Sequence, residues 1–126
     1  MKFKTMMTIK AVVALSFGPL LLLVPARLLN LLGLAYSSGA ALTAREYGAA
    51  MVGILLMTWL ARNIEAGVAR RAICWNLCIY DAIGLAATLY FLLSGVLNPL
   101  GWGIAGIYLF FTVGFGYFLI PQNQAA

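Results

Sequence analysis

The chain has 126 residues, of which 64% are hydrophobic and only 9% are charged. In soluble domains, about a quarter of all residues are charged. This composition therefore excludes an ordinary soluble domain and indicates an integral membrane protein. The sequence contains no histidine. That absence excludes Ser-His and Cys-His nucleophile pairs, histidine zinc sites and the usual axial ligands of haem.

Four apolar stretches are long enough to cross a bilayer, whose core of about 30 Å requires about 20 residues of helix. They cover residues 6–24, 44–61, 72–94 and 101–120. Pro25 and Pro121 end the first and the last stretch, and segments with Gly, Asn or Ser separate the others. We therefore expect an all-α fold, a four-transmembrane-helix bundle that forms one domain over residues 1–126.

The beginning of the chain has two interpretations. Lysines precede an apolar run that ends at Val24-Pro25-Ala26, a pattern also seen in cleaved signal peptides. We favour a retained first span. After Pro25, the run to Leu34 places leucines on both sides of Arg27 and Asn30. This pattern predicts a short amphipathic helix at the membrane interface.

Thr43 directly precedes the second span, and Glu46 lies in its first turn. Together they match the Ser/Thr-x-x-Glu pattern of a capping box. Their side chains would accept hydrogen bonds from the first backbone N–H groups of the helix. The pattern therefore predicts a helix cap made by Thr43 and Glu46, with no chemical role for Glu46. Arg45 is a candidate functional residue, which could bind a lipid phosphate or a carboxylate of a partner.

Asp81 is the strongest candidate functional residue. It follows Arg71 by ten residues, so it lies about 15 Å along the third span, near the bilayer midplane. An ionised carboxylate there costs about 2.5 to 3.5 kcal/mol on insertion scales. We expect Asp81 to be largely neutral, hydrogen-bonded and turned towards the bundle interior or a water-filled cavity. Arg45 and Lys10 are poorly placed to pair with it, because their side chains lean towards their helix N-termini.

Ser16, Thr88 and Thr112 are the expected polar partners of Asp81. One interpretation is a proton or cation relay. The other, which we favour, is hydrogen bonding between helices that stabilises the bundle, because a relay needs more than one titratable group. Cys74 and Cys78 share the helix face of Asp81, but two thiols without histidine do not form a metal site. We expect apolar packing for both, and no metal.

Small residues spaced four apart allow helix backbones to approach closely. The sequence offers three such pairs: Ala49 with Gly53, Gly84 with Thr88, and Thr112 with Gly116.

Basic residues near the span ends indicate the orientation. Six lie on one side (Lys2, Lys4, Lys10, Arg62, Arg70, Arg71) and two on the other (Arg27, Arg45). We expect both termini in the cytoplasm. The net charge of +5 then reflects topology and attraction to anionic lipids. The expected partners are membrane lipids and other membrane subunits or further copies of the chain. No nucleic acid is expected, because the basic residues are scattered.

Several strings resemble small bacterial four-helix membrane proteins that are broadly similar to the DoxX-like group. They are AREYGAAMVGILLMTWLAR (44–62), ARRAI (69–73), DAIG (81–84), LGW (100–102) and GFGYF (114–118). The resemblance extends from about Pro25 to the end of the chain. It implies a four-helix bundle in the bacterial inner membrane. It transfers no catalytic residue to this chain.

The segments between the spans are too short to form a domain for a soluble substrate. We therefore expect a non-enzymatic integral membrane protein, an accessory or scaffold subunit of a larger membrane complex. Its apolar, glycine-bearing faces, such as Gly103, Gly106 and Ile107, could contact a partner. The alternative is a small oligomeric proton- or cation-linked transporter or channel that uses Asp81. A second alternative is the membrane anchor of a quinone-linked redox enzyme, with Tyr80 and Asp81 near the headgroup. No cofactor is assigned, and bound lipid, quinone or pigment stays open.

Overall fold

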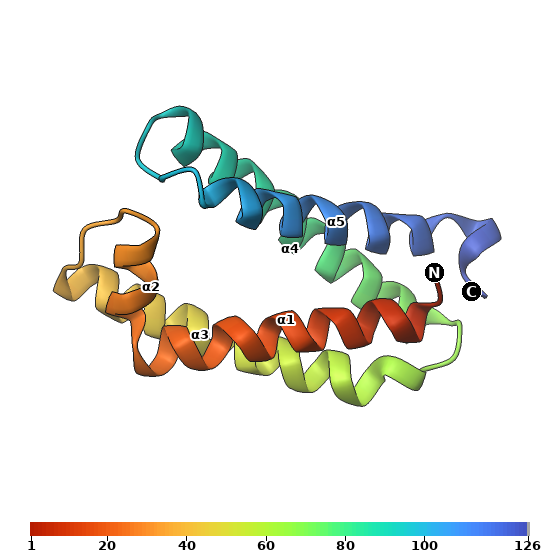
Figure 1. Cartoon of the computed structure of the whole chain (residues 1–126). Helices are drawn as coiled ribbons and strands as arrows, with labels where there is room; N and C mark the ends of the chain where they lie inside the picture. Colours follow the sequence, from red (N-terminus) through yellow and green to blue (C-terminus); the bar gives the residue numbers. More distant parts are fainter. Residues whose placement is uncertain (126) are drawn as a thin grey trace. The chain divides into compact units, whose positions relative to one another are not determined.

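The computed structural model describes residues 1–125, and these residues form helices without a strand (Figure 1). Four helices are long and apolar enough to cross a membrane. They are α1 (Phe3–Leu23), α3 (Ser38–Leu60), α4 (Val68–Leu93) and α5 (Gly101–Leu119). The shorter elements are α2 (Pro25–Leu31) and two 3-10 turns, η1 (Ala61–Asn63) and η2 (Pro121–Asn123). The predicted all-α fold with four apolar helices is confirmed.

The chain divides into two compact units. The α1–α3 unit comprises residues 7–62. The α4–α5 unit comprises residues 63 onward together with residues 1–6, which are the beginning of the chain and the first turn of α1. The prediction of one domain over the whole chain stays a prediction.

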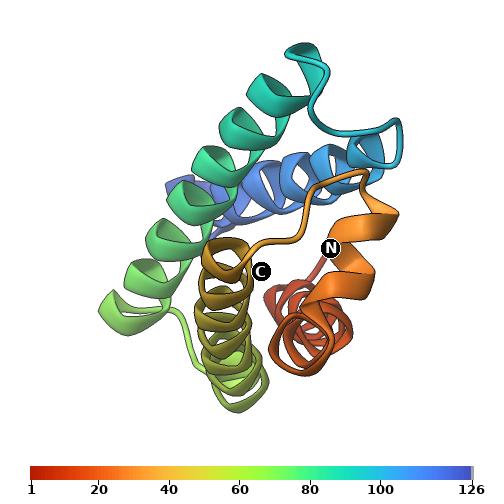
Figure 2. The ribbon, with the colours of Figure 1, turned by 90° about the vertical axis from the view of Figure 1, so that its left-hand side faces the viewer.

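In the α1–α3 unit, α1 and α3 run antiparallel and approach each other closely (Figure 2). A Cβ placed on Gly48 would lie 2.8 Å from the backbone nitrogen of Leu22 and 3.0 Å from the carbonyl oxygen of Gly18. Glycine is therefore required for the backbones to approach this far. A core cluster continues along this contact, consisting of Ala14, Leu21, Ala44 and Met51.

The short helix α2 follows α1 directly, as predicted. Pro25 occupies its first turn, where a missing N–H group costs no hydrogen bond. Leu28 and Leu29 pack against the core cluster, whereas Arg27 and Asn30 are exposed, so the helix is amphipathic. The helix ends at Leu31 and is closed by a Schellman motif, in which the φ of 77° at Gly33 allows Leu34 N–H to donate to the Leu29 carbonyl. The interfacial location of α2 stays a prediction.

The start of α3 differs from the prediction. Ser37 is the N-cap, and its hydroxyl oxygen accepts a hydrogen bond from Ala40 N–H at 3.1 Å. Thr43 and Glu46 lie inside α3 and are exposed, so the prediction that they cap the helix is wrong. The physical reason is that Ala40 and the residues after it favour helix. The helix therefore extends upstream until a serine with extended backbone can accept its first amides.

In the α4–α5 unit, two antiparallel helices lie side by side (Figures 1 and 2). A Cβ on Gly84 of α4 would lie 2.4 Å from Cε1 of Tyr108 on α5, so the tyrosine ring occupies the space that glycine leaves. One turn away, the Cys78 thiol donates to the Thr112 carbonyl at 3.5 Å. After Leu93, a second Schellman motif closes α4, and Gly95 with a φ of 77° makes it possible.

Two of the three predicted small-residue pairs lie on contact surfaces. Gly84 packs on Tyr108, and Gly116 contacts Cys78 at an ordinary distance. Ala49 and Gly53 are instead exposed, and a Cβ on Gly53 would meet no atom within 4 Å. The contact face of α3 is rotated by one residue from the predicted face and carries Gly48.

Candidate functional site

The buried face of α4 carries the candidate site. Beyond Arg70, its buried residues are Cys74, Leu77, Asp81 and Thr88, and they recur at spacings that keep them on one side. The Asp81 side chain has an exposed fraction of 0%. It lies thirteen residues after Val68 and twelve before Leu93, in the middle of the span. The expected central and buried position of Asp81 is thus found.

The hydroxyl groups predicted to bind Asp81 are used within their own helices. Thr88 donates to the Gly84 carbonyl at 2.8 Å, and Thr112 donates to the Tyr108 carbonyl at 2.8 Å. Ser16, which is exposed on α1, donates to the Val12 carbonyl at 2.9 Å. A hydroxyl group has one proton to donate. Each of these hydroxyls therefore donates its proton to a carbonyl four residues earlier, as is common for Ser and Thr inside helices. That the three residues are polar partners of Asp81 stays a prediction.

Residues close to Asp81 in the sequence pack against α5 through an aromatic ring and a thiol. The Tyr80 and Tyr108 rings meet edge to face, with centroids 6.3 Å apart. Tyr108 also covers Gly84, and Cys78 bonds the backbone of α5. The middle of the α4–α5 unit is thus a tightly packed contact with polar atoms at several positions. The Cys78 bond supports a packing role for this thiol.

Arg45 belongs to the α1–α3 unit and is exposed in the second turn of α3. Its guanidinium is therefore accessible to a lipid or a partner. Thr43 and Glu46 flank it on the same stretch of helix. Within residues 1–125, no group of three or more His, Cys, Asp or Glu side chains could hold a metal ion.

A second polar feature, which sequence reasoning missed, lies at the start of α4. The Arg70 guanidinium carbon lies 4.0 Å from the ring centroid of Phe3 and 5.7 Å from that of Phe118. The two rings meet edge to face at 5.6 Å. A guanidinium over an aromatic face is attracted by the ring quadrupole. The missed signal is the pair Arg70-Arg71 at a helix start with no acidic residue in its first turn.

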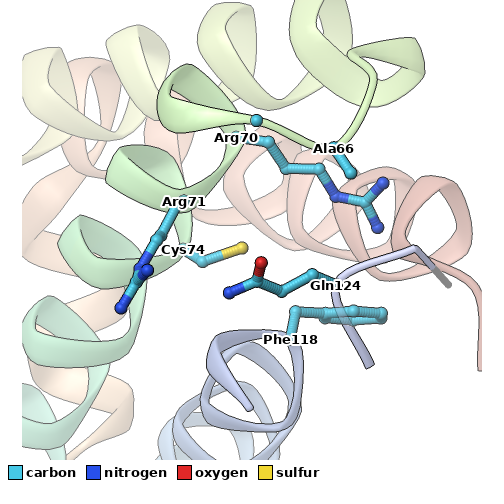
Figure 3. A pocket seen from close by; sticks show the side chains of 7 residues that line it. Ala66, Arg70, Arg71, Cys74, Phe118 and Gln124 are labelled. Carbon is cyan, nitrogen blue, oxygen red and sulfur yellow. The ribbon is translucent and has the colours of Figure 1, made fainter. Parts of the chain in front are cut away.

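Arg70 also lines a hollow, which we call the Arg70 notch (Figure 3). The notch is a shallow hollow that is open to the outside. Its lining comes from the connection before α4, the first two turns of α4, the end of α5 and the segment after α5. The lining residues are Ala66, Gly67, Arg70, Arg71, Cys74, Phe118 and Gln124. In Figure 3, the Arg70 guanidinium reaches past Ala66 above the Phe118 ring, while Arg71 points away on the other side.

The fold and these features define a multi-pass helical membrane protein with one buried carboxyl group in the middle of α4 and one buried guanidinium at the start of α4. In comparisons with protein-family models, curated proteins and solved structures, no significant match to the chain was found.

Proposed function

We propose that this chain is a non-enzymatic integral membrane protein that acts as an accessory or scaffold subunit of a larger membrane complex. One observation carries the proposal. The connections between the four long helices, residues 24–37, 61–67 and 94–100, are too short to fold into a domain that binds a soluble substrate. The surfaces that remain for binding a partner are the exposed sides of the long helices.

The exposed side of α5 supports this proposal. A Cβ on Gly103 or Gly106 would meet no atom within 4 Å, so both glycines leave room for a neighbouring helix. Bulky side chains stand beside them, with Trp102 55% exposed and Leu109 52% exposed. Small residues between large ones are typical of helix–helix interfaces in membranes.

The experiment is purification of the tagged chain from its own membrane in a mild detergent, followed by native mass spectrometry. We expect an assembly of fixed stoichiometry that is heavier than the 13.6 kDa chain. The double substitution Gly103→Leu with Gly106→Leu should release the partner and leave the helix content unchanged. Gly53→Leu, which also fills open space but on α3, is the matched control. Recovery of the wild-type chain alone would contradict the proposal.

For the location, we propose the bacterial inner membrane with both termini in the cytoplasm. The contact of Phe3 with Phe118, at 5.6 Å between centroids, supports a common side for the beginning of α1 and the end of α5. The charge bias supports the cytoplasmic side. The DoxX-like resemblance and the quinone-anchor alternative stay predictions.

The complete burial of Asp81 in a span favours a second candidate function, proton- or cation-linked transport by an oligomer. In proteoliposomes, the wild-type chain should then carry a pH-dependent flux that Asp81→Asn abolishes while circular dichroism shows an intact fold. Glu65→Gln, which neutralises an exposed carboxylate outside the long helices, is the control. No wild-type flux, or equal flux in Asp81→Asn, would reject transport through Asp81.

A further inference from the structure

The backbone at the start of α4 offers unused hydrogen-bond donors. Gly67 is the N-cap residue and has no side chain to accept the first amides of the helix. No acidic residue stands in the first turn. The first N–H groups of a helix lack partners within it, and together they act as about half a positive charge. Such a terminus binds anions readily when other groups help to hold them.

Arg70 supplies the second, independent observation. Its side chain is 8% exposed, and within residues 1–125 its Nη2 has no hydrogen-bond acceptor. The rings of Phe3 and Phe118 attract its positive charge but give the N–H groups in the guanidinium plane no acceptor. A buried donor without an acceptor is costly. Because Arg70 lines the notch, an oxyanion seated there would lie beside this guanidinium and could accept from it.

The other lining groups suit the same kind of ligand. Arg71 adds a positive charge at the rim, and Gln124 brings a side-chain amide to the notch (Figure 3). Glu65, the acidic residue of the connection, is exposed and does not line the notch. A planar guanidinium with parallel N–H groups matches the oxygens of a phosphate group.

The notch also lies at the depth of phosphate groups. With 26 residues, α4 is about 39 Å long, which exceeds the bilayer core of about 30 Å. Its first turn therefore reaches the headgroup region. Trp75, 49% exposed, stands at the next turns, as aromatic residues do near the interface.

We propose that the Arg70 notch binds one phosphate group, held by the Arg70 guanidinium and the first backbone amides of α4. The phosphate belongs either to an anionic lipid headgroup or to a soluble phosphate compound. The site is distinct from Asp81 and from the glycine-bearing side of α5, so its test is independent of the proposed function.

The test uses the full chain, delipidated in a neutral detergent and examined by native mass spectrometry. One series receives phosphatidylglycerol, a second receives diacylglycerol, which has the same tails without phosphate, and a third receives inorganic phosphate alone. We expect one phosphatidylglycerol bound per chain, and no retention of diacylglycerol. Arg70→Gln should weaken this binding about tenfold or more, because charge-assisted hydrogen bonds are lost. Arg62→Gln removes a positive charge that does not line the notch and whose guanidinium is stacked on Trp59, and this variant should bind as the wild type does.

Gly67→Asp keeps the proposal testable where Arg70→Gln fails to fold. The backbone of Gly67 is extended, with φ of 168°, and a Cβ there meets no atom within 4 Å, so both Asp and Ala fit. An Asp cap should hold α4 at least as well, because its carboxylate accepts the same amides. It should also reduce phosphate binding about tenfold, because its carboxylate occupies the amides that the phosphate would use and repels the negative charge of the phosphate. Gly67→Ala should bind like the wild type.

Each result has one meaning. Binding of phosphatidylglycerol without inorganic phosphate supports a lipid headgroup as the ligand. Binding of inorganic phosphate that depends on Arg70 supports a soluble phosphate compound. No binding of either, or binding that Arg70→Gln and Gly67→Asp leave unchanged in folded protein, overturns the proposal.

Discussion

At Ser37, one hydroxyl group decides where α3 begins. Its oxygen accepts the Ala40 amide, whereas Thr43 stands inside the helix. Both residues carry the side chain of a good cap, and Thr43 has the additional Glu46 of a capping box. The pattern alone therefore favours the wrong residue. The choice falls to Ser37 because the alanines between the two positions extend the helix at little cost.

The cap gives a direct prediction. Ser37→Ala should lower the free energy of unfolding by about 1 kcal/mol, because a first-turn amide loses its acceptor. The measurement is an SDS titration of the protein in dodecyl maltoside micelles, followed by far-ultraviolet circular dichroism. Thr43→Ala serves as the comparison and should change stability by about 0.5 kcal/mol or less, as expected for an exposed position. A larger loss at Thr43 than at Ser37 would mean that α3 begins later.

Asp81 and the hydroxyl residues show how far single residues can be interpreted from the sequence. The burial of Asp81 follows from its place in an apolar stretch, since an ionisable side chain avoids lipid. The hydrogen-bond acceptors of the hydroxyl groups do not follow from the sequence in the same way. Thr88 and Thr112 each have a carbonyl of their own helix within reach, and that local acceptor takes the proton.

At the scale of elements, glycine positions set how closely helices approach. The α1–α3 contact depends on Gly48, where a Cβ would meet the backbone of Leu22 and Gly18 rather than a movable side chain. Gly48→Ala should therefore destabilise the protein by about 1 to 3 kcal/mol, because the helices must separate. The same detergent titration measures this loss.

Gly53→Ala is the matched control on the same helix. A Cβ there meets open space, so the substitution should be neutral or stabilise by up to about 1 kcal/mol through reduced backbone entropy. Equal effects of Gly48→Ala and Gly53→Ala would show that the close approach of α1 and α3 is absent.

The α4–α5 contact gives a second prediction, in the form of a coupling. Gly84→Ala should destabilise by about 1 to 3 kcal/mol, because the Tyr108 ring lies where the new methyl group would stand. In Tyr108→Leu, the same glycine substitution should cost at least about 0.5 kcal/mol less, and a double-mutant cycle measures the difference. Additive effects would mean that the two residues do not touch. Gly106→Ala, in open space on α5, should be neutral or slightly stabilising.

At the scale of the whole molecule, four long apolar helices predict an even number of membrane crossings. In a variant with both native cysteines replaced by alanine, single cysteines are placed in the three connections as Ala35→Cys, Asn63→Cys and Val96→Cys. A membrane-impermeant maleimide should label the first and third from one side of the membrane and the second from the other. All three sites are at the surface of the described chain. Labelling of Ala35→Cys and Asn63→Cys from the same side would exclude a crossing by α3.

The sequence by itself determined the helical class, the four long apolar helices and the short amphipathic helix after the first. These properties depend on how many consecutive apolar residues a segment contains and on where Pro and Gly interrupt them, and both are local. The last residue of each long helix lies within one residue of its prediction, whereas α1, α3 and α4 begin upstream of theirs, at Phe3, Ser38 and Val68.

The tertiary structure decided which face of each helix meets a neighbour. It selected Gly48 over Gly53, and it brought Arg70 together with Phe3 and Phe118, which are far apart in the sequence. The physical reason is geometric. A residue adds 100° of rotation to an α-helix, so a shift of one position turns a different face to the partner. In a chain that is apolar on nearly every side, hydrophobicity does not choose among these faces, and close packing does.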